Sequence, residues 1–93
     1  MKEKARAHIF ISGRVQGVYF RENAVKKAQE LGIFGWIKNL TDKRVEALFE
    51  GEKKKVREMI IWAEQGPKSA NVISLEVGWQ DYTGEFDNFQ VEY

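Results

Sequence analysis

The chain lacks cysteine, and its 93 residues include only one histidine and one proline. Without cysteine there can be no disulfide, no thiolate metal site and no cysteine nucleophile. The lone histidine, His8, cannot build a histidine-based metal site by itself. We therefore expect a function without metal or other cofactor. The absence of thiols fits a reducing compartment, so the expected location is cytoplasmic.

Long apolar runs and an excess of one charge are also missing. The basic N-terminal residues are followed by an apolar run of only Ile9-Phe10-Ile11. A secretory signal needs about 7–15 apolar residues and a membrane-spanning helix needs about 20. The 15 basic residues are nearly balanced by 14 acidic ones, whereas nucleic-acid binders usually carry a basic surplus or stripe. The expectation is a soluble, unprocessed chain that binds neither membrane nor nucleic acid.

The length predicts a single domain over residues 1–93, because two hydrophobic cores cannot be built from so short a chain. A domain of this size buries roughly 60–65% of its unfolded surface, which is enough for it to fold without disulfides or a structural metal. Residues 1–6 are expected to form a flexible N-terminal tail. With no feature that indicates assembly, we expect a monomer.

The hydrophobic periodicity predicts an α+β fold. Period-two alternation predicts strands at 7–12, 34–39, 44–50 and 73–80, with a hairpin turn at 40–44 and a possible fifth edge strand at 89–93. Helical spacing predicts one helix at 21–31, ended by Gly32, and a second built on Val56, Met59, Ile60 and Ala63 and ended by Gly66-Pro67. The βαββαβ order is that of the ferredoxin-like split βαβ sandwich, in which two helices cover one face of an antiparallel sheet.

The segment from Gly13 to Arg21 has the features of an anion-binding loop. A strand that leads through a glycine-containing turn into a helix directs backbone N–H groups and the helix dipole at one spot. Gly17 allows the backbone to approach a ligand closely, and the planar guanidinium of Arg21 suits two phosphate oxygens. An arginine at a helix start is otherwise unfavourable, and a bound anion relieves that conflict. From these residues alone, an ordinary solvent-exposed connection is an equally good interpretation of the segment.

Two motifs resemble those of the acylphosphatase family. Gly13-x-Val15-Gln16-Gly17-Val18-x-Phe20-Arg21 is similar to the family's phosphate-loop signature, and Gly35-Trp36-Ile37-Lys38-Asn39, continuing from Val45 to Gly51, is similar to its second signature. The resemblance covers nearly the whole chain. Two positions depart from the family pattern. Lys43 stands where the family usually has a glycine, which puts the geometry of the turn in question, and Ile37 is bulkier than the usual small residue.

The resemblance implies a division of roles. Arg21 would bind the phosphoryl group together with the backbone N–H groups of Val15, Gln16, Gly17, Val18, Tyr19 and Phe20. Asn39 would hold the attacking water, since a side-chain amide can both donate and accept a hydrogen bond. From its position alone, Asn39 better suits a residue that starts a turn, and it is the two motifs together that favour the catalytic role.

The substrate implied is a small acyl phosphate, cleaved to carboxylate and inorganic phosphate. Its carboxylate leaving group has a conjugate acid of pKa roughly 4, so no general acid is required. Phosphoryl transfer needs mainly positioning and charge stabilisation, which an arginine, amides and an oriented water supply. A covalent phosphocysteine route is closed, because Val15 occupies the cysteine position of the C-x₅-R pattern.

Three other readings compete with this one. An RNA-binding domain of the same order needs an aromatic RNP1 pattern on its third strand, and Arg44 to Gly51 lacks its glycine and first aromatic residue. A metal carrier of this fold needs the C-x-x-C that is missing. An acylphosphatase-like domain that binds phosphate without significant turnover stays open.

Overall fold

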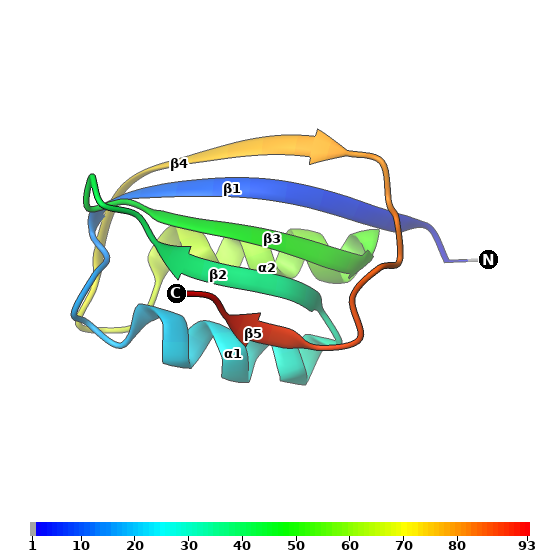
Figure 1. The fold of residues 1–93 in the computed structure, drawn as a ribbon, viewed down its shortest axis with the longest axis horizontal. Helices are drawn as coiled ribbons and strands as arrows, with labels where there is room; N and C mark the ends of the chain where they lie inside the picture. Colours follow the sequence, from blue (N-terminus) through cyan, green and yellow to red (C-terminus); the bar gives the residue numbers. More distant parts are fainter. Residues whose placement is uncertain (1) are drawn as a thin grey trace.

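The computed structural model describes residues 2–93, and within them two helices and five strands follow the predicted order (Figure 1). The elements are β1 (Lys4–Arg14), α1 (Phe20–Leu31), β2 (Phe34–Asn39), β3 (Val45–Glu52), α2 (Lys53–Gln65), β4 (Asn71–Gln80) and β5 (Phe89–Val91). Both helices cover the same face of the sheet (Figure 1). The ferredoxin-like α+β fold predicted from the periodicity is confirmed.

The strands lie in the order β4-β1-β3-β2-β5. Neighbours are antiparallel except at one edge, where β5 runs parallel to β2. The expectation of a wholly antiparallel sheet is therefore wrong at this edge. After β4 the chain crosses the end of the sheet before it enters β5, so β5 starts at the same end as β2 (Figure 1). Short-range periodicity cannot reveal this direction, because it is decided by the path of the connection.

The first strand begins earlier than expected. β1 starts at Lys4, and Ala5 and Arg6 are paired with Gly51 and Glu50 of β3. The expectation of a flexible tail is therefore wrong for residues 4–6, and Met1 lies outside the described residues. Lys4 and Arg6 alternate with Ala5 as in a half-buried strand. The pattern was missed because these residues are close to the N-terminus, where a flexible tail was expected.

A buried carboxylate anchors the connection between β4 and β5. Glu50 is 1% exposed. It accepts hydrogen bonds from Arg6 at 3.2 Å, from the backbone N–H of Thr83 at 2.9 Å and from that of Gly84 at 3.1 Å. Buried charges are tolerated only when they are paired in this way. The same arginine pairs with Glu85 at 2.7 Å, and these hydrogen bonds hold the pKa of the Glu85 carboxyl below its ordinary value.

The hydrophobic core lies between the helices and one face of the sheet. Alternate residues of β1 are buried there, as are apolar residues at helical spacing in both helices; these include Ala7, Ile9, Ile11, Ala24, Ala28, Val56, Met59 and Ala63. Phe20, at the start of α1, is also part of the core. Its packing holds the β1–α1 loop at one end of the sheet. Neither helix of the described chain is long and apolar enough to cross a membrane.

Candidate active site

Two valines hold the β1–α1 loop against the core. Val15 and Val18 are 1% and 4% exposed, whereas Gly17 and Tyr19 point into solvent. The apolar side chains of the loop act as anchors, so the backbone between them is left at the surface. This division leaves the main chain of Gly17 and the side chain of Tyr19 at the surface of the loop.

The backbone φ angles of the loop alternate in sign. Gly17 has φ 70° and Tyr19 has φ 63°, and among the non-glycine residues of 2–93 only Tyr19 and Lys43 have a positive φ. Val18 therefore has a negative φ between two left-handed neighbours. Such alternation turns successive N–H groups to one side and forms an anion-binding concavity. A left-handed conformation costs a tyrosine on the order of 1 kcal/mol, and strain of this kind concentrates at functional sites.

Helix α1 begins at the end of this concavity. Its N-cap is Tyr19, and no side chain caps it. The first-turn N–H groups of a helix have no partner within the helix, and an uncapped start leaves them available to an anion. The carbonyl of Tyr19 is turned the other way, because it accepts from the backbone and side-chain N–H groups of Asn23 at 3.2 and 2.9 Å.

Arg21 and Asn39 meet beside the loop. A hollow of about 190 Å³, called here the loop hollow, is lined by Val15, Gly17, Tyr19, Phe20, Arg21, Glu22 and Asn39. Arg21 lies in the first turn of α1, as predicted, and its guanidinium carbon is 5.4 Å from the ring centre of Tyr93. Within residues 2–93 it forms no ion pair. Its charge is therefore free to meet an anion.

Asn39 ends β2, where it pairs with Val45 of β3. Its side-chain oxygen Oδ1 is buried and has no hydrogen-bond partner among the described residues. A buried acceptor without a partner costs about 1–3 kcal/mol, and native structures keep few of them. Such a group in the wall of a hollow is typical of a site built for a ligand. The two side chains that the family resemblance had singled out, Arg21 and Asn39, thus converge on one place.

Two tethers of the loop were missed by sequence reasoning. The side-chain Nε2 of Gln16 donates to the carbonyl oxygens of Leu40 at 2.7 Å and Arg44 at 2.9 Å. From the segment after α2, the Ser69 hydroxyl donates to the carbonyl oxygen of Val18 at 2.6 Å. Gln16 had been assigned a role only through its backbone. A signal was present, because Gln16 is the one amide side chain between Gly13 and Arg21, a segment otherwise made of glycine, apolar residues, a tyrosine and two arginines.

The turn between β2 and β3 carries the departure from the family pattern. Lys43 has φ 81°, a conformation that glycine adopts at much lower cost. The turn is closed by hydrogen bonds from Leu40 N to the Arg44 oxygen at 2.8 Å and from Lys43 N to the Leu40 oxygen at 3.3 Å. Asp42 accepts from the backbone and the guanidinium of Arg44, and these hydrogen bonds lower the pKa of its carboxyl. The glycine-type geometry is therefore kept despite the lysine.

The other departure is absorbed by the core. Ile37 is fully buried on the helix side of the sheet and does not line the loop hollow. His8 lies elsewhere, on the face of the sheet opposite the helices, where its Nε2 is 2.6 Å from Glu46. Within residues 2–93 no group of three or more histidine and acidic side chains is placed to hold a metal ion.

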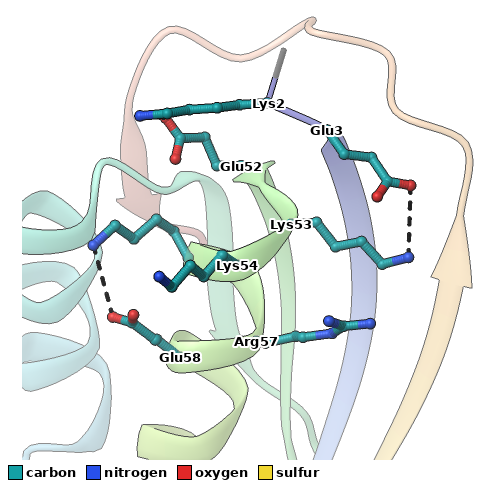
Figure 2. Close-up of a pocket in the computed structure, with 8 residues that line it drawn as sticks. Lys2, Glu3, Glu52, Lys53, Lys54, Arg57 and Glu58 are labelled. Atoms are coloured by element: carbon teal, nitrogen blue, oxygen red, sulfur yellow. Dashed lines mark ion pairs between the residues drawn. The ribbon is translucent and has the colours of Figure 1, made fainter.

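A second hollow lies at the other end of β1, where α2 starts (Figure 2). This charged hollow has a volume of about 500 Å³ and is lined by Lys2, Glu3, Glu52, Lys53, Lys54, Lys55, Arg57 and Glu58. The three consecutive lysines at the start of α2, Lys53, Lys54 and Lys55, lie in its wall.

Comparison with known proteins agrees with the geometry. A family model described as Acylphosphatase matches residues 7–91. The acylphosphatase of Pelotomaculum thermopropionicum is 49% identical over 90 residues, covering 97% of this chain and 98% of the relative. That of Roseiflexus sp. is 50% identical over 91 residues, covering 98% of each. The chain belongs to the acylphosphatase family.

A solved structure supports the same assignment. The crystal structure of acylphosphatase from Bacillus subtilis superimposes with a TM-score of 0.92 at 29% identity, and the match covers 96% of this chain and 99% of the other. The interpretation drawn from the two motifs is confirmed, and the chain is a hydrolase of acyl phosphates. The assignment of roles to single residues depends on the site geometry.

Proposed function

We propose that this acylphosphatase binds the phosphoryl group of its substrate in the loop hollow and hydrolyses it with a water held by Asn39. The observation that carries the proposal is the meeting of three features in the loop hollow: a backbone whose φ angles alternate in sign, an arginine without an ion pair and a buried amide oxygen without a hydrogen-bond partner, the last two judged within residues 2–93. The first two suit a tetrahedral anion. The third suits a water beside it.

The reaction needs no more groups than these. The water oxygen bonds to phosphorus as the bond from phosphorus to the acyl oxygen breaks, and the carboxylate leaves with that electron pair. The carboxylate is a weak base and departs without a proton. The proton lost by the water passes to a phosphate oxygen or to solvent. Arg21 and the loop N–H groups stabilise the charge on the equatorial oxygens, the main requirement of a loose phosphoryl-transfer transition state.

The assay that tests the proposal compares the wild type with Asn39→Ala. Purified wild type should hydrolyse benzoyl phosphate, with inorganic phosphate as a competitive inhibitor. Asn39→Ala should lower kcat by about 100-fold, the usual loss for one group that acts on the transition state. Its inhibition constant for phosphate should stay within about threefold, because Arg21 and the loop are retained. Asn88→Ala, the same change at an exposed position of the β4–β5 connection, is the matched control and should leave both constants unchanged.

Two results would overturn the proposal. One is an Asn39→Ala variant that keeps the wild-type kcat. The other is a wild type that binds phosphate without hydrolysing acyl phosphate, which would return the chain to the reading of a binding domain. Repeating the assay with EDTA tests the expectation of a metal-independent reaction, and activity lost to the chelator and restored by magnesium or zinc would contradict it. The monomeric state and the cytoplasmic location stay predictions.

A further inference from the structure

We infer that Gln16 is a positioning residue, whose side-chain amide links the phosphate-binding loop to the β2–β3 turn and thereby holds Asn39 in register with the bound phosphoryl group. The inference rests on the proposed roles of Arg21 and Asn39. It assigns a further role to a side chain that touches neither the loop hollow nor the reacting atoms.

The hydrogen bonds of Gln16 are placed at the two ends of the turn. Its amide nitrogen has two N–H donors, and it lies within hydrogen-bond distance of two carbonyl oxygens, those of Leu40 at 2.7 Å and Arg44 at 2.9 Å. Leu40 directly follows Asn39, and Arg44 directly precedes Val45, the partner of Asn39 across the hairpin. The two accepting residues therefore flank the last rung of the β2–β3 ladder. Gln16 holds this rung from the side of the loop.

The other end of the link is in the anion-binding loop itself. Gln16 is the neighbour of Val15 and Gly17, both of which line the loop hollow. Gln16 is thus one residue away from the lining of the loop hollow, and its acceptor Leu40 is one residue away from Asn39. Any shift of the turn away from the loop must break these hydrogen bonds, each worth about 0.5–1.5 kcal/mol net.

Asn39 depends on this link more than an ordinary side chain would. Its Oδ1 has no hydrogen-bond partner of its own among residues 2–93, so the backbone on which it stands sets its position. The turn that follows is strained, with Lys43 at φ 81°. A strained turn persists only where its surroundings hold it. The amide of Gln16 contributes to that restraint.

Ser69 provides a contrast within the same loop. Its hydroxyl also restrains the loop, through the carbonyl oxygen of Val18 at 2.6 Å, but among the described residues it forms no hydrogen bond with the β2–β3 turn. Ser69→Ala releases the loop without releasing Asn39. Gln16→Met removes both donors at nearly constant length and releases Asn39. The two variants separate a general loosening of the loop from a loss of register.

The experiment is a double-mutant cycle on kcat for benzoyl phosphate, with the inhibition constant of inorganic phosphate measured beside it. Gln16→Met should lower kcat by about 10- to 100-fold, the range expected when a reacting group is misplaced by a fraction of an ångström to 1 Å. Phosphate inhibition should change by less than about threefold. In the Asn39→Ala background Gln16→Met should lower kcat by less than about twofold, because there is no amide left to position. Ser69→Ala should act equally in both backgrounds.

An equal loss of kcat from Gln16→Met in both backgrounds would overturn the inference, as would an unchanged kcat with a lowered melting temperature alone. If the methionine variant does not fold, Gln16→Leu removes the same donors. An NMR readout is independent of catalysis. The Asn39 side-chain amide signals should shift or broaden in Gln16→Met and stay in place in Ser69→Ala, and unmoved signals in Gln16→Met would refute the link. A kcat unaffected by Asn39→Ala would instead refute the proposed function, while the NMR comparison would still decide the role of Gln16.

Discussion

The two hollows at opposite ends of β1 differ in what they are made of. The charged hollow is the larger, about 500 Å³ against about 190 Å³, and its wall contains five basic side chains, whereas one arginine lines the loop hollow. Figure 2 shows acidic side chains among these basic ones. Lys2, Lys53 and Lys55 lie 3.6–3.9 Å from Glu52, Glu3 and Glu58. If the volume of a hollow and its number of cations decided where an anion binds, the charged hollow would be the anion site.

The loop hollow has the features that the charged hollow lacks. Its arginine has no ion pair within the described residues, and its wall includes a backbone whose φ angles alternate in sign, a pattern that typically turns successive N–H groups to one side. Exposed lysines that already neighbour carboxylates gain little from a further anion, because exposed ion pairs are worth roughly 0–1 kcal/mol. Preorganised main-chain donors need no reorganisation when an anion binds. An anion site is therefore indicated by free, fixed donors and not by the amount of charge.

The largest expected effect tests this contrast with one substitution at each end. Arg21→Ala should lower kcat/KM for benzoyl phosphate by at least about 10³-fold, the lower range for an arginine that stabilises phosphoryl transfer. Arg57→Ala, in the wall of the charged hollow, should leave it unchanged. Thermal unfolding of both variants should stay close to that of the wild type, since each arginine is at the surface of a helix. Equal losses in the two variants would show that total positive charge, not the loop hollow, supports activity.

A smaller effect is expected from the backbone of the loop. Gly17 and Gly32 have the same φ of 70°, and a Cβ at either position would meet nothing within 4 Å. Changing either to alanine should therefore lower the free energy of unfolding by a similar amount, about 1 kcal/mol. Only Gly17→Ala should also weaken inhibition by inorganic phosphate and lower kcat/KM, because Gly32 caps the far end of α1. If both variants keep the wild-type phosphate affinity, the left-handed backbone is not part of the anion site.

The smallest effect concerns the turn beside Asn39. Lys43→Gly should raise the free energy of unfolding by up to about 1 kcal/mol, because glycine adopts φ 81° without the cost that lysine bears, less the entropy that glycine loses on folding. Thr41→Gly in the same turn, at a residue without positive φ, should lower it. Urea denaturation of the two variants measures both changes. A destabilised Lys43→Gly would mean that the lysine side chain contributes contacts that outweigh the strain.

Much of the fold was predictable because it depends on local periodicity. The helices at Phe20–Leu31 and Lys53–Gln65 have apolar residues at helical spacing and glycine at their ends. The strands alternate along the sequence, and the inward residues of β1 form the core. The direction of β5 and the start of β1 at Lys4 were not predictable in this way. Each depends on partners more than 40 residues away in sequence, and periodicity contains no information about partners.

The candidate site was likewise predictable only in part. Motif resemblance pointed to Arg21 and Asn39, and both side chains line the loop hollow. It pointed to Gln16 only as a backbone donor, because a motif states which residue is present and not which carbonyl it reaches. The contacts of Gln16 and Ser69 join segments that are distant in sequence.

The amino-acid sequence on its own determined the order of helices and strands, and its two motifs pointed to the family to which the chain belongs. These follow from residue types and their spacing, which act over a few residues. The tertiary structure decided that a buried amide oxygen, a guanidinium that forms no ion pair within residues 2–93 and a backbone of alternating φ sign line one hollow, and that the Gln16 side chain reaches the β2–β3 turn. The physical reason is that hydrogen bonds and free charges depend on distances in space, and only the folded core brings residues 16, 21 and 39 to the same end of the sheet.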